Sequence, residues 1–221
     1  MKKASLRGLI KNLIWSMEGS ELPCIPCEIA NSRRPDRAHK GHMATRRGEV
    51  FFVDILAVSI PTFWGGNYGC CFIDSATRLA IPDIVARKSH VDESLDNLIN
   101  FCAAHGVEIG LIQTDDEVVF AGKDCRFRGR AKKAAIPLQQ SPPYSHWANG
   151  VVERFILTLL RKSFALIAQS GASNQLWGAA MIHAAHLYNM MPHAALDGDS
   201  PYMRWFGTKT AGRTVAENLG L

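Results

Sequence analysis

The sequence predicts an α/β domain in which helices flank a mixed five-stranded sheet. Short apolar runs separated by turn residues dominate residues 50–86, which is typical of strands. Apolar residues at steps of three and four dominate residues 91–105, 152–164 and 177–191, which is typical of helices. With 47% hydrophobic and 20% charged residues, the chain of 221 residues can bury one sizeable core.

Residues 50–86 are predicted to form an antiparallel meander, because each apolar run is followed by turn residues. A turn is expected at Gly65-Gly66-Asn67, after Pro61, and another at Ser75-Ala76-Thr77. The three strands are expected at 50–59, 68–74 and 78–86.

Residues 91–105 are predicted to form a helix that packs by one face. Ser89 is its candidate N-cap, Asp92 and Glu93 fall in its first turn, and Gly106 ends it. Its apolar face is expected to hold Val91, Leu95, Leu98, Ile99 and Cys102.

The second half of the chain alternates strands and helices. A strand at 107–114, a basic segment at 121–133 and a short strand at 136–140 precede a loop rich in Pro, Tyr and Ser. A long helix is expected after Asn149-Gly150, and its apolar stripe comprises Val152, Phe155, Ile156, Leu159, Leu160 and Phe164. A last helix over Trp177–Met191 is expected to pack through Trp177, Met181, Ala184, Ala185 and Tyr188.

Three carboxylates fall on a central strand, at a strand end and at a helix start. Asp54 lies within FFVDILAV, Asp115 follows the strand that ends at Thr114, and Glu153 falls in the first turn of the long helix. Each alone has an ordinary explanation, because Asp54 could pair with an arginine and acids are common at helix starts. An acid in a buried strand is nevertheless costly unless it is paired or binds metal. Together the three favour a Mg²⁺ or Mn²⁺ site, since these hard cations prefer oxygen ligands.

Five motifs occur in a specific order around these acids. They are FFVDIL with Asp54, YGCCFIDSATR with Asp74 and Arg78, IQTDDEVVF with Asp115, PPYSHWANGVVER with Asn149 and Glu153, and SPYMRWFG. In this order they resemble the integrase core of Ty1/copia-type retrotransposons, which are relatives of retroviral integrases. The 37 residues between Asp115 and Glu153 are close to that family's D,D-35-E spacing, and the resemblance runs from about residue 24 to 208.

The resemblance implies a ribonuclease H-like fold and a two-metal polynucleotidyl transferase. In that fold the strands of Asp54 and Asp115 lie side by side, and the helix of Glu153 packs across their edge. Asp54 would bridge two Mg²⁺ or Mn²⁺ ions, and Asp115 and Glu153 would each hold one of them. The implied reactions are trimming of the 3′ end of element DNA and joining of that end to target DNA, with Tyr144 and Asn149 lining the loop beside the DNA.

The implied partners are DNA, further copies of the chain, and the protease and reverse transcriptase domains of a polyprotein. The implied location is the nucleus or a virus-like particle. No membrane partner is expected, because no run of 18 apolar residues occurs.

The sequence departs from the family pattern beside two of the acids. TDDEVVF stands where the family has TDNGGEF, so that Glu117 and Val118 replace glycines and Asp116 and Glu117 add negative charge. Ser-His-Trp stands where the family has Thr-Pro-Gln-Gln. Two alternatives therefore stay open: a catalytically decayed DNA-binding or assembly module with the same fold, and a ribonuclease H-like nuclease acting on RNA–DNA hybrids.

Basic residues gather in two segments. Residues 1–50 hold ten Lys and Arg against five Asp and Glu, and the remainder holds fifteen of each, so the net charge of +5 arises before the first core strand. A phosphate backbone or plain solvent explains both segments equally well. The candidate phosphate contacts are Arg33, Arg34, Arg37, Lys40, Arg46 and Arg47 in the first segment, and Lys123, Arg126, Arg128, Arg130, Lys132 and Lys133 in the second.

Cysteine and histidine patterns predict no complete zinc site. Cys24 and Cys27 have zinc-ligand spacing but supply only two of four ligands, and His39 and His42 follow them where the family's histidines precede. We expect the remnant of an HHCC zinc module that binds Zn²⁺ only if it is completed elsewhere. Buried thiols are expected at Cys70, Cys71 and Cys102, and structural histidines at His183, His186 and His193.

The predicted organisation has four parts. They are the zinc-module remnant at 1–30, a basic linker at 31–48, the catalytic core at 49–208 and a C-terminal tail at 209–221.

Overall fold

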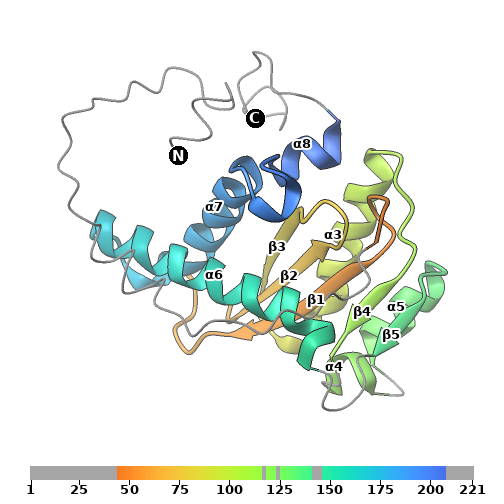
Figure 1. Ribbon diagram of the computed structural model, residues 1–221. Coiled ribbons are helices and arrows are strands. Elements are labelled where there is room, and N and C mark those ends of the chain that lie inside the picture. Colours follow the sequence, from red (N-terminus) through yellow and green to blue (C-terminus); the bar gives the residue numbers. More distant parts are fainter. Residues whose placement is uncertain (1–43, 116–117, 123–124, 141–145, 208–221) are drawn as a thin grey trace.

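A computed structural model of the protein describes residues 44–115, 118–122, 125–140 and 146–207 as one mixed sheet with helices on both faces (Figure 1). The sheet order is β3-β2-β1-β4-β5. β1, β2 and β3 are antiparallel neighbours, while β4 runs parallel to both β1 and β5. The strands are β1 (Phe51–Ala57), β2 (Tyr68–Asp74), β3 (Ala80–Val85), β4 (Ile112–Thr114) and β5 (Leu138–Gln140). The predicted α/β class, the meander and the mixed five-stranded sheet are confirmed.

Helices cover the two faces of the sheet in separate groups. One face carries α3 and α5, and the other carries α6 and α7 (Figure 1). The helices are α3 (Val91–Ala104), α4 (Val118–Ala121), α5 (Arg126–Lys133), α6 (His146–Ser170), α7 (Trp177–Met190) and α8 (Pro201–Phe206). Within the described ranges, no helix has the length and apolar character needed to cross a bilayer.

The alternation of residues along the central strands divides the core into two clusters. Successive side chains of a strand point to opposite faces. Phe51 and Val53 of β1 therefore pack with α3, whereas Phe52 and Leu56 pack with α6 and α7. Cys70, Cys71 and Cys102 are buried as predicted, and burial keeps the pKa of the Cys71 thiol well above its ordinary value.

Three local predictions were wrong. The N-cap of α3 is His90, not Ser89, because a 3₁₀ turn at Lys88–His90 continues directly into the helix. β4 begins at Ile112 and not at residue 107. The amide of Gly110 donates to the backbone carbonyl of Gly48, which precedes β1, so this residue does not take part in the pairing of β4 with β1. Phe164 is 54% exposed and is not part of the buried stripe. It follows buried Phe155 by nine residues, and at about 100° per residue this places the two side chains on opposite sides of the helix.

Asp74 holds the turn that leads from β2 to β3. One of its carboxylate oxygens accepts from the amide and hydroxyl of Thr77, both at 2.7 Å, and the other accepts from the amide of Gly48 at 2.8 Å. Burial raises the pKa of the Asp74 carboxyl, while these hydrogen bonds act in the opposite direction. The motif IDSATR thus has a structural role at Asp74, and it delivers Arg78 in a left-handed conformation with φ of 63°.

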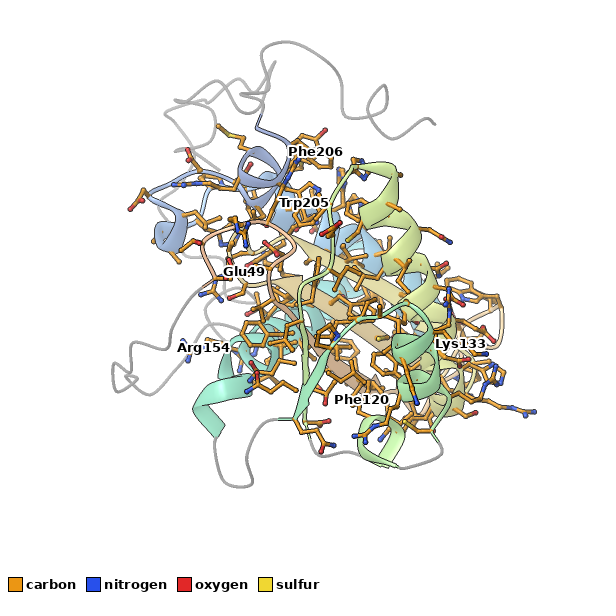
Figure 2. The ribbon with its side chains drawn as sticks, turned by 90° about the vertical axis from the view of Figure 1, so that its right-hand side faces the viewer. Glu49, Phe120, Lys133, Arg154, Trp205 and Phe206 are labelled. Carbon is orange, nitrogen blue, oxygen red and sulfur yellow. The ribbon has the colours of Figure 1, made fainter. Side chains whose placement is uncertain are left out.

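The SPYMRWFG motif closes the core through α8. The Ser200 hydroxyl caps the helix by accepting from the amide of Met203 at 3.2 Å, and Gly207 ends it with φ of 68°. Trp205, labelled in Figure 2, is fully buried. Its ring lies near the rings of Phe51 and Phe101. Arg47 donates to the backbone carbonyl of Trp205 at 2.6 Å, so this candidate phosphate contact also tightens the fold.

Candidate active site

The strand register brings Asp54 and Asp115 together. β1 and β4 are parallel, with Phe51 opposite Ile112 and Phe52 opposite Gln113. Carried two residues further, the same register places Asp115, the first residue after β4, beside Asp54. The two acids therefore come from adjacent central strands although 60 residues separate them in the sequence.

Both acids are directed to the sheet face that α6 covers. Asp54 lies two residues from both Phe52 and Leu56, so its side chain points to the same face of β1 as theirs. Phe52 and Leu56 pack against α6 and α7. Ile112 of β4 packs on the opposite side, so the alternation directs Gln113 and Asp115 toward α6. Asp54 is half-buried, and one of its carboxylate oxygens accepts from the amide of Ile55 at 2.7 Å.

α6 carries Glu153 over this face. Val152, Phe155, Ile156 and Leu159 of the predicted stripe are buried against the sheet, which fixes the helix. α6 begins at His146, before Asn149-Gly150, so the prediction that Glu153 lies in the first turn was wrong. The dipole effect that favours acids is confined to the first turn of a helix. The ordinary explanation of Glu153 as a helix-start acid is therefore weakened.

Several predicted site residues lie outside what the structure describes. For Glu153 and Asn149 the backbone is described within α6 but the side chain is not. Tyr144, Lys123, Asp116 and Glu117 lie outside the described residues altogether, as do the zinc candidates Cys24, Cys27, His39 and His42 and the basic residues from Arg33 to Lys40.

The basic segment on α5 is tied to α3, on the sheet face opposite to α6. Arg126 pairs with Asp92 at 3.0 Å, and Arg130 pairs with Asp96. Figure 2 shows Lys133 of α5 and Arg154 of α6 on opposite sides of the sheet. Two of the candidate phosphate contacts thus have a structural role in joining the helices. Arg128 is half-buried, and Lys132 and Lys133 are exposed.

The chemistry of the acids fits a divalent cation. Asp54, Asp115 and Glu153 are the residues that could hold Mg²⁺ or Mn²⁺, because these cations prefer carboxylate oxygens as ligands. Among the described side chains, no three His, Cys, Asp or Glu residues gather around one point, and Glu153 is not among those side chains. The rings of His183 and His186 stack 6.4 Å apart on α7.

The chain is similar to polyproteins of plant transposons. It is 24% identical over 188 residues to the retrovirus-related Pol polyprotein from transposon RE1 of Arabidopsis thaliana, a match that covers 85% of this chain and 13% of the polyprotein. It is 21% identical over 198 residues to the corresponding polyprotein from transposon TNT 1-94 of Nicotiana tabacum, covering 88% of this chain and 15% of the polyprotein. The chain therefore spans about one seventh of the length of these relatives. No family model matches it.

Solved structures of retroviral proteins have a similar fold. The simian T-cell lymphotropic virus intasome in complex with the PP2A regulatory subunit B56 gamma matches with a TM-score of 0.61 and 15% identity, over 86% of this chain and 65% of that one. The catalytic core domain of BIV integrase matches with a TM-score of 0.53 and 16% identity, over 72% of this chain and 95% of that one. The chain is thus similar in sequence to retrovirus-related Pol polyproteins of plant transposons, and its core has the ribonuclease H-like fold of retroviral integrase catalytic cores.

Proposed function

We propose that the chain is an integrase core that catalyses metal-dependent 3′-end processing and strand transfer of retrotransposon DNA. The observation that carries this proposal is the placement of Asp54 and Asp115 on one face of adjacent parallel strands, beneath the helix of Glu153. The fold and the polyprotein relatives support the same class of enzyme.

The residues of the chain fit the chemistry of phosphoryl transfer. Asp54, Asp115 and Glu153 would hold Mg²⁺ or Mn²⁺, which supplies activation of a water or 3′-hydroxyl and neutralises charge on the scissile phosphate. Asp54 lies on β1, and Asp115 directly follows β4, which pairs with β1 in a defined register. The buried stripe of α6 holds the backbone of Glu153. Rigid elements of this kind place ligands more accurately than loops do.

A packed helix follows the departure from the family pattern. Val118, at the position of the family's second glycine, begins the short helix α4 (Val118–Ala121). Phe120 in this helix is fully buried, and its ring meets Phe127 of α5 edge-on at 4.9 Å. The replacement of the second glycine by Val118 is thus compatible with a helix whose Phe120 side chain is buried in the core.

The proposed partners follow from the same class. They are element and target DNA, a second copy of the chain, and the protease and reverse transcriptase parts of a polyprotein, in a nuclear or virus-like particle setting. Zn²⁺ would be bound only if another segment completed the Cys24 and Cys27 pair.

Removal of divalent metal is expected to abolish activity. A labelled duplex donor with a free 3′-hydroxyl and a plasmid target should give joined product in Mn²⁺ or Mg²⁺ and none in excess EDTA, because the carboxylates act through bound cations. A parallel incubation with an RNA–DNA hybrid tests the alternative that the chain is a ribonuclease H-like nuclease, by measuring cleavage of the hybrid. Cleavage of the hybrid without joining of DNA would replace the integrase assignment, and DNA binding without any metal-dependent chemistry would favour the decayed module.

A further inference from the structure

A pocket of about 250 Å³ opens beside α6, between this helix, α7 and the β2–β3 turn. Its polar lining comes from Arg78 of the turn, Arg154 and Thr158 of α6, Tyr188 of α7 and His193 beyond α7. The rest of the described lining is apolar, and none of it is a carboxylate.

The pocket is separate from the proposed metal site. On the surface of α6, position 153 lies about 100° from Arg154 and about 140° from Thr158. Leu157, which is 51% exposed, lies between these positions on the helix. The pocket and Glu153 are therefore on different flanks of α6, and the pocket adjoins β2 while the acids come from β1 and β4.

Two guanidinium groups share this space. The β2–β3 turn holds Arg78 in its left-handed conformation, with its amide donating to the Asp74 carbonyl at 2.8 Å. Burial has the largest influence on the pKa of Arg78 and lowers it; Tyr188 and Asp74 raise this pKa, and the charge of Arg154 lowers it. A guanidinium group is protonated in proteins. The fold therefore places two cationic side chains in the lining of one pocket.

Neutral donors complete the lining. Burial raises the pKa of the Tyr188 phenol to about 12, so its hydroxyl keeps its proton at neutral pH. Its ring is held between Phe155, at 4.5 Å, and His193, at 4.2 Å. Burial lowers the pKa of His193, the hydrogen bond to the Tyr188 backbone carbonyl acts in the opposite direction, and the charges of Lys162 and Arg78 lower this pKa further.

We propose that this pocket binds a phosphate group, with Arg78 and Arg154 as its charged contacts and the Tyr188 hydroxyl as a neutral donor. Side chains from a turn and two helices line the pocket, and guanidinium groups form strong charge-assisted hydrogen bonds to phosphate. The source of the phosphate is either a nucleic-acid backbone, which rests on the proposed function, or a free phosphate ion.

The test measures duplex DNA binding by fluorescence anisotropy over a series of salt concentrations in EDTA. Arg154→Gln should weaken DNA binding about 3- to 10-fold and reduce the salt slope by about 0.9, as expected for one lost phosphate contact. Tyr188→Phe, which removes only the hydroxyl, should weaken binding less. The matched control is Arg87→Gln, an exposed arginine beyond the other end of β3, which should change the slope less.

A second arm uses inorganic phosphate and pyrophosphate as probes of thermal stability. If they raise the Tm of the wild type but not of Arg154→Gln, and DNA binding is unaffected, the pocket takes a free phosphate. The proposal is overturned if Arg154→Gln and Arg87→Gln have the same DNA affinity and salt slope, and if phosphate and pyrophosphate change the Tm of Arg154→Gln as much as that of the wild type. Both arms are read without divalent metal or turnover, so they are independent of whether strand transfer succeeds.

Discussion

Asp54→Asn is expected to reduce metal-dependent strand transfer by at least about 100-fold and to leave the fold intact. Loss of residues that merely orient metal ligands costs about 10- to 100-fold, and Asp54 is proposed to be a ligand itself. The substitution preserves size and an acceptor oxygen for the amide of Ile55, so stability should change little. Initial rates of joining in Mn²⁺, with circular dichroism as the check of folding, measure the effect.

Asp83→Asn is the matched control for this substitution. Asp83 is a half-buried strand acid on β3 that accepts from Asn97 at 2.9 Å, away from the proposed site. It should retain near wild-type joining, whereas Asp115→Asn and Glu153→Gln should match Asp54→Asn. Groups that act as a unit are strongly non-additive, so the triple variant should be little worse than any single one. An Asp54→Asn protein as active as Asp83→Asn would contradict the assignment.

Trp205→Ala is expected to lower the free energy of unfolding by about 3–5 kcal/mol, the usual cost of removing a large buried ring. The ring is fully buried, with centroids 6.1 Å from Phe51 and 5.7 Å from Phe101, and so it joins α8 to β1 and α3. Urea unfolding followed by circular dichroism measures the change.

Trp205→Phe is the control for this loss of packing. The indole nitrogen is buried and has no hydrogen-bond partner among the described residues, so removing it leaves no other polar group without a partner. We expect Trp205→Phe to cost less than about 1.5 kcal/mol. If Trp205→Ala were as stable as Trp205→Phe, α8 would not be part of the cooperative core.

The sequence predicted the antiparallel meander well because each of its three strands carries its own signal. β2 was placed without error, since its apolar run is bounded by turn residues on both sides. The start of α6 could not be predicted in this way. Asn149-Gly150 is a turn signal by local preference, and a glycine inside a helix costs about 1 kcal/mol relative to alanine. The packing of α6 on the sheet outweighs that local preference.

The candidate site depends on contacts that local sequence cannot reveal. The pairing of β1 with β4 joins segments 60 residues apart, and only the family resemblance anticipated it. The pocket at Arg154 joins a turn and two helices, and no single pattern connects Arg78 with Tyr188. Arg126 and Arg130 resembled a free basic surface because their partners Asp92 and Asp96 lie on another helix.

The most direct test of the proposed active site is a calorimetric titration of Mn²⁺ into the chain with duplex DNA present. The wild type and the double variant Asp54→Asn with Asp115→Asn are compared at the same protein and DNA concentrations. We expect saturable binding to the wild type that the double variant loses, because the two carboxylates from adjacent strands are proposed to hold the cations. Equal binding to both proteins, or none to the wild type, would contradict the assignment of Asp54 and Asp115 as metal ligands.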